Sequence, residues 1–198
     1  PLSLLNLLLG AALLAMPLNS RAVAADLTQL IAAVAKHESG QNAECLWQLE
    51  RIVRDSAGQR KQRAEVESAL TQLLAPTATF EARRFACQQL AIIGSDASVP
   101  ALAKLLRENE TIGIACLAFG NRPSAKADRA LRSAVSAARG SGRAQIIAAL
   151  GNRRDAKAVS LLAKAARETE TIVAQAALQA LGKIGKKKKK KAIAGLQS

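Results

Sequence analysis

The sequence predicts an all-α protein, a right-handed solenoid of about five helical hairpins with a repeat of about 30 residues. Residues 105–112 (LLRENETI) and 165–172 (AARETETI) share an Arg-Glu-x-Glu-Thr-Ile core at an offset of 60 residues. Leu150-Gly151 recurs as Leu181-Gly182, so 60 residues correspond to two units. The apolar residues are mostly Ala and Leu, with three Phe, one Trp and no Tyr. Ala and Leu favour helices, whereas the residues that favour strands are scarce.

The first 24 residues are predicted to be a signal peptide. Residues 2–18 are almost entirely apolar, and Ala22-Val23-Ala24 has the small-x-small pattern that signal peptidase cuts. We therefore expect cleavage before Ala25 and a periplasmic or secreted bacterial protein. The alternative is an uncleaved anchor, although the segment is only marginally long enough to span a membrane and Pro17 falls near its end.

Residues 25–79 are expected to form N-terminal capping helices and a divergent repeat. Asp26 is suited to N-cap a helix through residue 36. A second helix is expected over 42–57 and a third over 61–74, which Pro76 ends because the residue before a proline avoids helical geometry. The second helix is predicted to bury Cys45, Leu46, Leu49, Ile52 and Val53.

Regular repeats are expected over residues 80–198, with helices separated by glycine-containing turns. The predicted helices are 80–93, 96–107, 110–119, 124–138, 143–150, 155–168 and 171–181, followed by a short segment through residue 196. Asp96 is the expected cap of the second of these, and Gly140-Ser141-Gly142 is expected to be a flexible turn. One hairpin cannot bury its apolar surface alone, but stacked hairpins can.

Residues 85–102 (FACQQLAIIGSDASVPAL) resemble a HEAT-like repeat of the short bacterial kind, also called the phycobilisome-lyase type. In such repeats one helix ends in Leu-x-x-x-Gly, and the next begins near a small or acidic residue and carries a Val/Ile-Pro-x-Leu step. Residues 180–185 (ALGKIG) have the same helix end. The resemblance covers about residues 80–193. The chain is similar to exported HEAT-repeat proteins of environmental bacteria. It implies a fold that mostly binds other macromolecules and rarely catalyses reactions.

The composition leaves few residues for catalysis, so we predict no enzyme activity, no metal and no cofactor. His37-Glu38 resembles the pairs with which HEAT-like hydroxylases bind iron, but no second His completes a site. We expect a solvated His at a helix end. Gly140–Arg143 lacks the strand and the Lys-Ser/Thr of a P-loop, and no Gly-x-Ser-x-Gly elbow occurs. Cys45, Cys87 and Cys116 are expected to be free, buried thiols.

Basic residues on the second helices of the hairpins predict a partner-binding surface. Lys104 and Arg107 recur as Lys164 and Arg167 two units later, and the net charge is +14. Second helices usually line the concave surface of HEAT solenoids, where a row of cations attracts an acidic partner. The predicted row, here called the basic ladder, comprises Lys104, Arg107, Arg129, Arg132, Arg139, Lys164 and Arg167. The alternative is a solvated surface whose charge is partly cancelled by Glu108, Glu110, Glu168 and Glu170.

A second candidate is the lysine run, Lys186, Lys187, Lys188, Lys189, Lys190 and Lys191, which is expected to be a poorly ordered insert that binds polyanions. The predicted function is a non-enzymatic protein-interaction scaffold in the cell envelope with an unidentified acidic protein partner. A nucleic-acid-binding HEAT-like module is the alternative, opposed by the export signal and by the shortage of aromatic stacking residues. A phycobilisome-lyase-like accessory protein is the lesser alternative.

Overall fold

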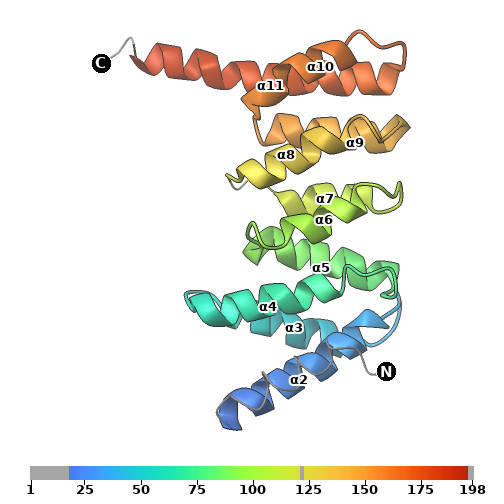
Figure 1. The fold of residues 1–198 in the computed structure, drawn as a ribbon, viewed down its shortest axis with the longest axis vertical. Coiled ribbons are helices and arrows are strands. Elements are labelled where there is room, and N and C mark those ends of the chain that lie inside the picture. The colour runs from blue at the N-terminus through green and yellow to red at the C-terminus, as the bar shows by residue number, and fades with distance from the viewer. Residues whose placement is uncertain (1–17, 121–122, 196–198) are drawn as a thin grey trace, which may run out of the picture.

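The computed structural model describes the backbone of residues 18–120 and 123–195, and the side chains of residues 26–120 and 123–185. Helices stack one above another along these residues, from α2 at one end to α11 at the other (Figure 1). No strand occurs in the described part of the chain. The predicted all-α, HEAT-like solenoid is therefore confirmed.

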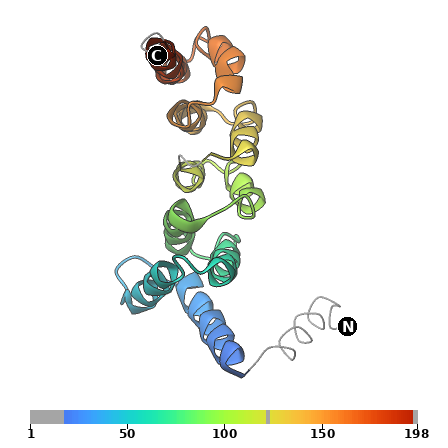
Figure 2. The same cartoon turned by 90° about the vertical axis from the view of Figure 1, so that its left-hand side faces the viewer.

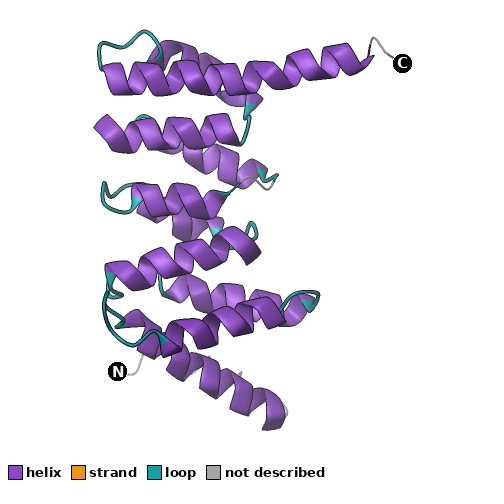
Figure 3. Cartoon of the chain, turned by 180° about the vertical axis from the view of Figure 1, so that it is seen from behind, coloured by secondary structure: helices purple, strands orange, loops and turns teal. Residues whose placement is uncertain are grey.

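The helices form two layers, seen end-on in Figure 2. The first layer holds the opening helix of each regular hairpin and is seen from its own side in Figure 3: α5 (Phe80–Ile93), α7 (Ile112–Phe119), α9 (Gly140–Asn152) and α11 (Thr171–Gly195). The second layer holds the returning helices: α4 (Arg60–Gln72), α6 (Val99–Leu105), α8 (Ala125–Ala134), and α10 (Val159–Ala165) with the short 3-10 helix η1 (Ala156–Ala158) before it. At the N-terminal end, α2 (Leu18–Ala35) and α3 (Glu44–Asp55) complete the stack.

Successive helices of the first layer approach very closely where glycines face them. A Cβ atom added at Gly151 of α9 would lie 2.6 Å from Cα of Ala180 in α11. A Cβ added at Gly142 would lie 2.7 Å from Cδ1 of Ile112 in α7. Both distances are shorter than van der Waals contact. Gly151 is needed for close packing because it faces the backbone of α11, whereas Gly142 faces only the end of the flexible Ile112 side chain. The predicted turn at Gly140–Gly142 is consequently wrong: α9 begins at Gly140, and Gly142 packs against α7.

The C-terminal helix also differs from the prediction. Gly182 and Gly185 were expected to break it, yet α11 continues through both and through the lysine run to Gly195. A glycine inside a helix costs only about 1 kcal/mol relative to Ala, and lysine is a good helix former. The lysine run is therefore a helical continuation of α11 and not an insert within a turn. The side chains of that run lie outside the described residues.

Local sequence predicted α5 with its observed bounds, but it misplaced the start of α6. Asp96 does not cap α6, which begins at Val99; its carboxylate instead accepts a hydrogen bond from the Ser124 hydroxyl. The turn before α6 is held by Glu67 of α4, whose Oε1 accepts from the N–H of Ser95 at 2.6 Å and of Ser98 at 3.2 Å. A partner about 30 residues away in sequence gives no local signal.

The N-terminal end brings one further correction. His37 was expected to be solvated, but it is 8% exposed, and its carbonyl accepts a hydrogen bond of 2.5 Å from the Thr79 hydroxyl just before α5. Helix α2 starts at Leu18 and so runs through the predicted cleavage site, residues 22–24. The rest of the predicted signal peptide, residues 1–17, lies outside the described residues.

Candidate partner-binding face

Most of the basic ladder is exposed on the helices of the second layer or just after their ends. Lys104 on α6, Arg129 on α8 and Lys164 on α10 are exposed. Arg107 and Arg167, which follow the ends of α6 and α10, are also exposed. None of these five side chains has an ion-pair partner within the described part of the structure. They are therefore available to an acidic partner.

The two remaining ladder residues make internal contacts. Arg139 precedes α9 and donates from Nη1 to the carbonyls of Ser136 (2.7 Å) and Ala138 (2.9 Å). Arg132 of α8 is half-buried and forms an ion pair with Asp155 in the turn before η1. Arg132 thus joins two hairpins, and it is not a free contact residue.

Two of the four glutamates that were expected to cancel the ladder's charge, Glu108 and Glu168, are paired with arginines, whereas Glu110 and Glu170 have no ion pair among the described residues. Glu108 accepts from Nη1 of Arg83 at 3.5 Å, and Glu168 accepts from both terminal nitrogens of Arg143 at 2.6 and 2.8 Å. The two ion pairs are related by the 60-residue offset, and each joins a first-layer helix to the end of the following second-layer helix. The arginine side chains are largely buried, at 13% and 15% exposed. The repeated Arg-Glu-x-Glu-Thr-Ile core therefore marks a structural ion pair, and two of its glutamates do not neutralise the ladder.

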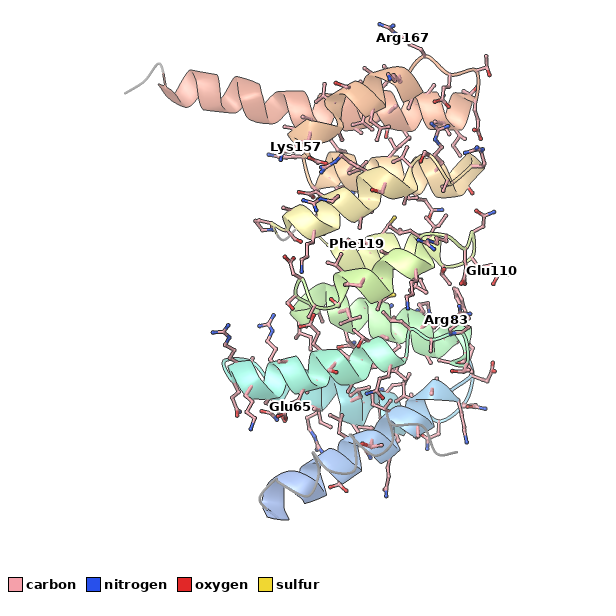
Figure 4. All side chains as sticks on the ribbon, in the orientation of Figure 1. Glu65, Arg83, Glu110, Phe119, Lys157 and Arg167 are labelled. Atoms are coloured by element: carbon pink, nitrogen blue, oxygen red, sulfur yellow. The ribbon has the colours of Figure 1, made fainter. Side chains whose placement is uncertain are left out.

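The structure divides the ladder residues between two hollows and the open surface. Arg129 and Arg132 line a cleft of about 730 Å³ between the start of α8 and the turn from α9 to η1. Arg107 lies at a hollow of about 500 Å³ between α6 and α8, which is otherwise lined mainly by alanines. Lys104, Arg139, Lys164 and Arg167 line neither hollow. Figure 4 shows Lys157 of η1 and Arg167, which follows α10, at opposite ends of the last second-layer helix.

The larger hollow, here called the Arg154 cleft, is lined by more charged residues than the two that were predicted from the sequence as site residues, Arg129 and Arg132. Its charged lining residues are Asp128, Arg129, Arg132, Arg153, Arg154, Asp155 and Lys157. Both carboxylates are already bound: Asp128 accepts from Nε of Arg153 at 2.7 Å, and Asp155 pairs with Arg132 and accepts from the Lys157 N–H at 3.0 Å. The exposed Arg129, Arg154 and Lys157 are left without an acidic partner among the described residues.

Arg153 joins the backbone segments that border this cleft. Its side chain is 2% exposed. Besides Asp128, it donates to the carbonyls of Phe119 (2.7 Å) and Gly120 (2.8 Å) at the end of α7, and to that of Ser124 (3.3 Å) before α8. A helix end leaves carbonyls without intrahelical partners, and a buried guanidinium with five donors can satisfy several of them. Arg153 thus fixes the turn from α9 to η1 against the turn from α7 to α8.

Arg154 occupies a backbone position that normally belongs to glycine. Helix α9 ends in a Schellman motif: the Asp155 N–H donates to the Leu150 carbonyl (3.1 Å) and the Arg154 N–H to the Gly151 carbonyl (3.0 Å). This motif places Arg154 in the left-handed region, with φ of +54°. The other described residues with positive φ are all glycines. A side chain with a Cβ costs about 1 kcal/mol there relative to glycine.

Arg153, Arg154 and Lys157 were not among the predicted site residues. The signal that sequence offered was the Arg-Arg-Asp run directly after the glycine-containing helix end at Gly151. It was interpreted only as the start of the helix predicted over residues 155–168. Asp155 caps η1, because its carboxylate accepts from the Lys157 N–H.

The described part of the chain offers few residues for metal binding or nucleophilic catalysis. No cluster of three or more His, Cys, Asp or Glu side chains occurs there that could hold a metal ion. Cys87 is a free, buried thiol as predicted, whereas Cys45 and Cys116 are also free but only half-buried. Burial raises the pKa of Cys87 to about 12, against a smaller lowering by the Arg83 charge, and burial alone raises the pKa of Cys116 to about 12. Both thiols are thus protonated at neutral pH and are poor nucleophiles.

Within the described residues, every helix is too short or too polar to cross a bilayer.

Comparison with known families identifies one match: residues 127–198 match the family model of HEAT repeats. Comparisons with curated proteins and with solved structures gave no significant match. HEAT repeats are generally non-catalytic, protein-binding scaffolds. The matched segment covers α8 to α11, and the same two-layer packing extends through the hairpins before it. The stacked hairpins and the family match together support a HEAT-like repeat protein.

Proposed function

We propose that this chain is a non-enzymatic scaffold that binds an acidic protein partner over the outer surface of its second layer. The observation that carries the proposal is the placement of charge. First-layer arginines bind Glu108 and Glu168, so neither of these two glutamates pairs with the exposed ladder cations beside it. A row of uncompensated cations on a rigid stack attracts and orients an acidic surface.

A test of this proposal uses a fluorescently labelled hexaglutamate peptide as the probe and anisotropy as the readout. In one variant, glutamine replaces Lys104, Arg107, Lys164 and Arg167, four exposed cations of the ladder. We expect roughly tenfold weaker binding, because exposed charges each contribute a few tenths of a kcal/mol. The control variant makes the same replacement at four exposed cations of the N-terminal region and the first layer, of which only Arg84 has an acidic partner among the described residues, Glu81: Lys36, Arg51, Arg54 and Arg84.

The control keeps total charge equal between the two variants. We expect it to bind within about twofold of wild type, because surface charges more than a Debye length away are largely screened. Equal weakening in both variants would mean that the peptide responds only to net charge, and the second-layer face would lose its support.

Nucleic acid is the competing ligand, and the aromatic residues argue against it. Unpaired bases bind proteins by stacking on exposed aromatic side chains. The exposed aromatic residues in the described structure are Trp47 on α3 and Phe80 at the start of α5, and neither belongs to the second layer. Tighter binding of a single-stranded oligonucleotide than of the peptide, lost in the same ladder variant, would favour the nucleic-acid function instead.

We further propose that the scaffold acts outside the cytoplasm. The apolar segment over residues 2–18 and the small-x-small site at Ala22–Ala24 support export. The test is a fusion of residues 1–60, with an initiating Met, to an alkaline phosphatase that lacks its own signal. Phosphatase activity in a Gram-negative host is the expected result, and an inactive fusion retained in the cytoplasm would contradict export.

A further inference from the structure

We propose that the Arg154 cleft is the anchor site of this scaffold, where a short acidic peptide segment of the partner places its carboxylates against Arg129, Arg154 and Lys157. This inference rests on the proposed function, since it names the place on the second-layer side where the acidic partner is held. Three observations carry it: the charge balance of the cleft, its size, and the conformation of Arg154.

The charge balance leaves the cleft with cations that the fold does not use. Of its five lining cations, Arg132 and Arg153 are bound to the only two carboxylates among its lining residues, Asp155 and Asp128. Arg129, Arg154 and Lys157 project from two different hairpins onto the same hollow and are exposed. The start of α8 also lines the cleft, and the positive end of its helix dipole adds to the field. A carboxylate entering here meets several donors, and both carboxylates among the lining residues are already paired.

The size of the cleft fits a segment of chain better than a single ion. Its volume is about 730 Å³, within the range of sites that enclose small organic ligands. Its three free cations come from three places in the chain: Arg129 from α8, Arg154 from the turn between α9 and η1, and Lys157 from η1. Side-chain carboxylates spaced along a peptide can pair with cations distributed in this way, and guanidinium groups bind carboxylates in a bidentate manner.

Arg154 carries its charge at a backbone position where glycine would be less strained. The Schellman motif at the end of α9 requires a left-handed residue, and glycine occupies every other described position of positive φ. Arg154 makes no hydrogen bond with its side chain to the described protein that would offset the strain. Strained residues of this kind concentrate at binding sites.

The decisive variant is therefore Arg154→Gly, because it separates folding from binding. Relief of strain should raise the melting temperature, whereas loss of the guanidinium should weaken hexaglutamate binding about fivefold or more. A second cleft variant, Arg129→Gln, should weaken binding similarly with little change in melting temperature, since its side chain is exposed. The matched control is Arg51→Gln on α3, an exposed arginine outside the cleft, which should leave binding within about twofold of wild type.

The outcomes distinguish this inference from the proposed function. Unchanged binding by Arg154→Gly and Arg129→Gln, together with loss in the four-residue ladder variant, would overturn the cleft and leave the scaffold proposal standing. No binding of hexaglutamate by the wild-type protein would overturn both. An oligothymidylate of equal charge that binds more tightly than the peptide, and is lost in Arg154→Gly, would replace the peptide with nucleic acid as the occupant. A lower melting temperature for Arg154→Gly would remove the argument from strain and overturn the inference.

Discussion

The turn before α6 and the turn before η1 occupy corresponding places in the solenoid but are held by opposite charges. In the first, Glu67 of the preceding second-layer helix accepts backbone N–H groups of Ser95 and Ser98. In the second, Arg132 of the preceding second-layer helix pairs with Asp155. Both contacts join one hairpin to the next. Only the second turn also carries exposed cations. The contacts that both turns share therefore stabilise the stack, whereas the exposed cations of the second turn are available to a partner.

Removing Arg153 should have the largest effect on the turn before η1. Arg153→Ala would leave Asp128 unpaired and the carbonyls of Phe119 and Gly120 without their donor. Breaking a buried ion pair by removing one partner typically costs about 3–5 kcal/mol. We expect a loss of this size in the free energy of unfolding, measured by urea denaturation. A loss under about 1 kcal/mol would show that the two hairpins are not joined through this residue.

Removing Glu67 should have a smaller effect, at the turn before α6. Glu67→Ala leaves the N–H groups of Ser95 and Ser98 without an acceptor in a mostly buried setting, at about 1–3 kcal/mol. Glu67→Gln retains a carbonyl acceptor and is the matched control, with a loss of roughly half as much. Hexaglutamate binding should be unchanged in both variants. Weaker binding in Glu67→Ala would contradict the assignment of this turn to the stack alone.

Sequence periodicity was sufficient for the architecture because stacking depends on where apolar residues recur. It yielded the two-layer solenoid, the bounds of α5 and the exposure of Lys104, Lys164 and Arg167. It failed where a residue's role depends on a contact about 30 residues away. Glycines that permit helix contact, such as Gly142 and Gly151, have the same appearance in sequence as glycines that end helices.

The candidate site was only partly predictable for the same reason. The ladder follows the helical repeat, so most of its exposed members could be placed from sequence. The partners of Glu108 and Glu168 lie 25 residues earlier on another helix. The structure was therefore needed to show that these glutamates pair with first-layer arginines and not with the ladder. The Arg154 cleft forms where two hairpins meet, and no single repeat contains all of its residues.

The most direct test of the account is to release the two glutamates from their first-layer arginines and measure hexaglutamate binding. In Arg83→Met/Arg143→Met, Glu108 and Glu168 lose their partners and lie next in sequence to Arg107 and Arg167. We predict that binding weakens by about threefold to tenfold, because two ladder cations would then be neutralised. Adding Glu108→Gln and Glu168→Gln restores the wild-type net charge and should restore binding. Binding that stays at the wild-type level in the double variant, verified as folded by circular dichroism, would contradict the claim that these ion pairs keep the second layer cationic.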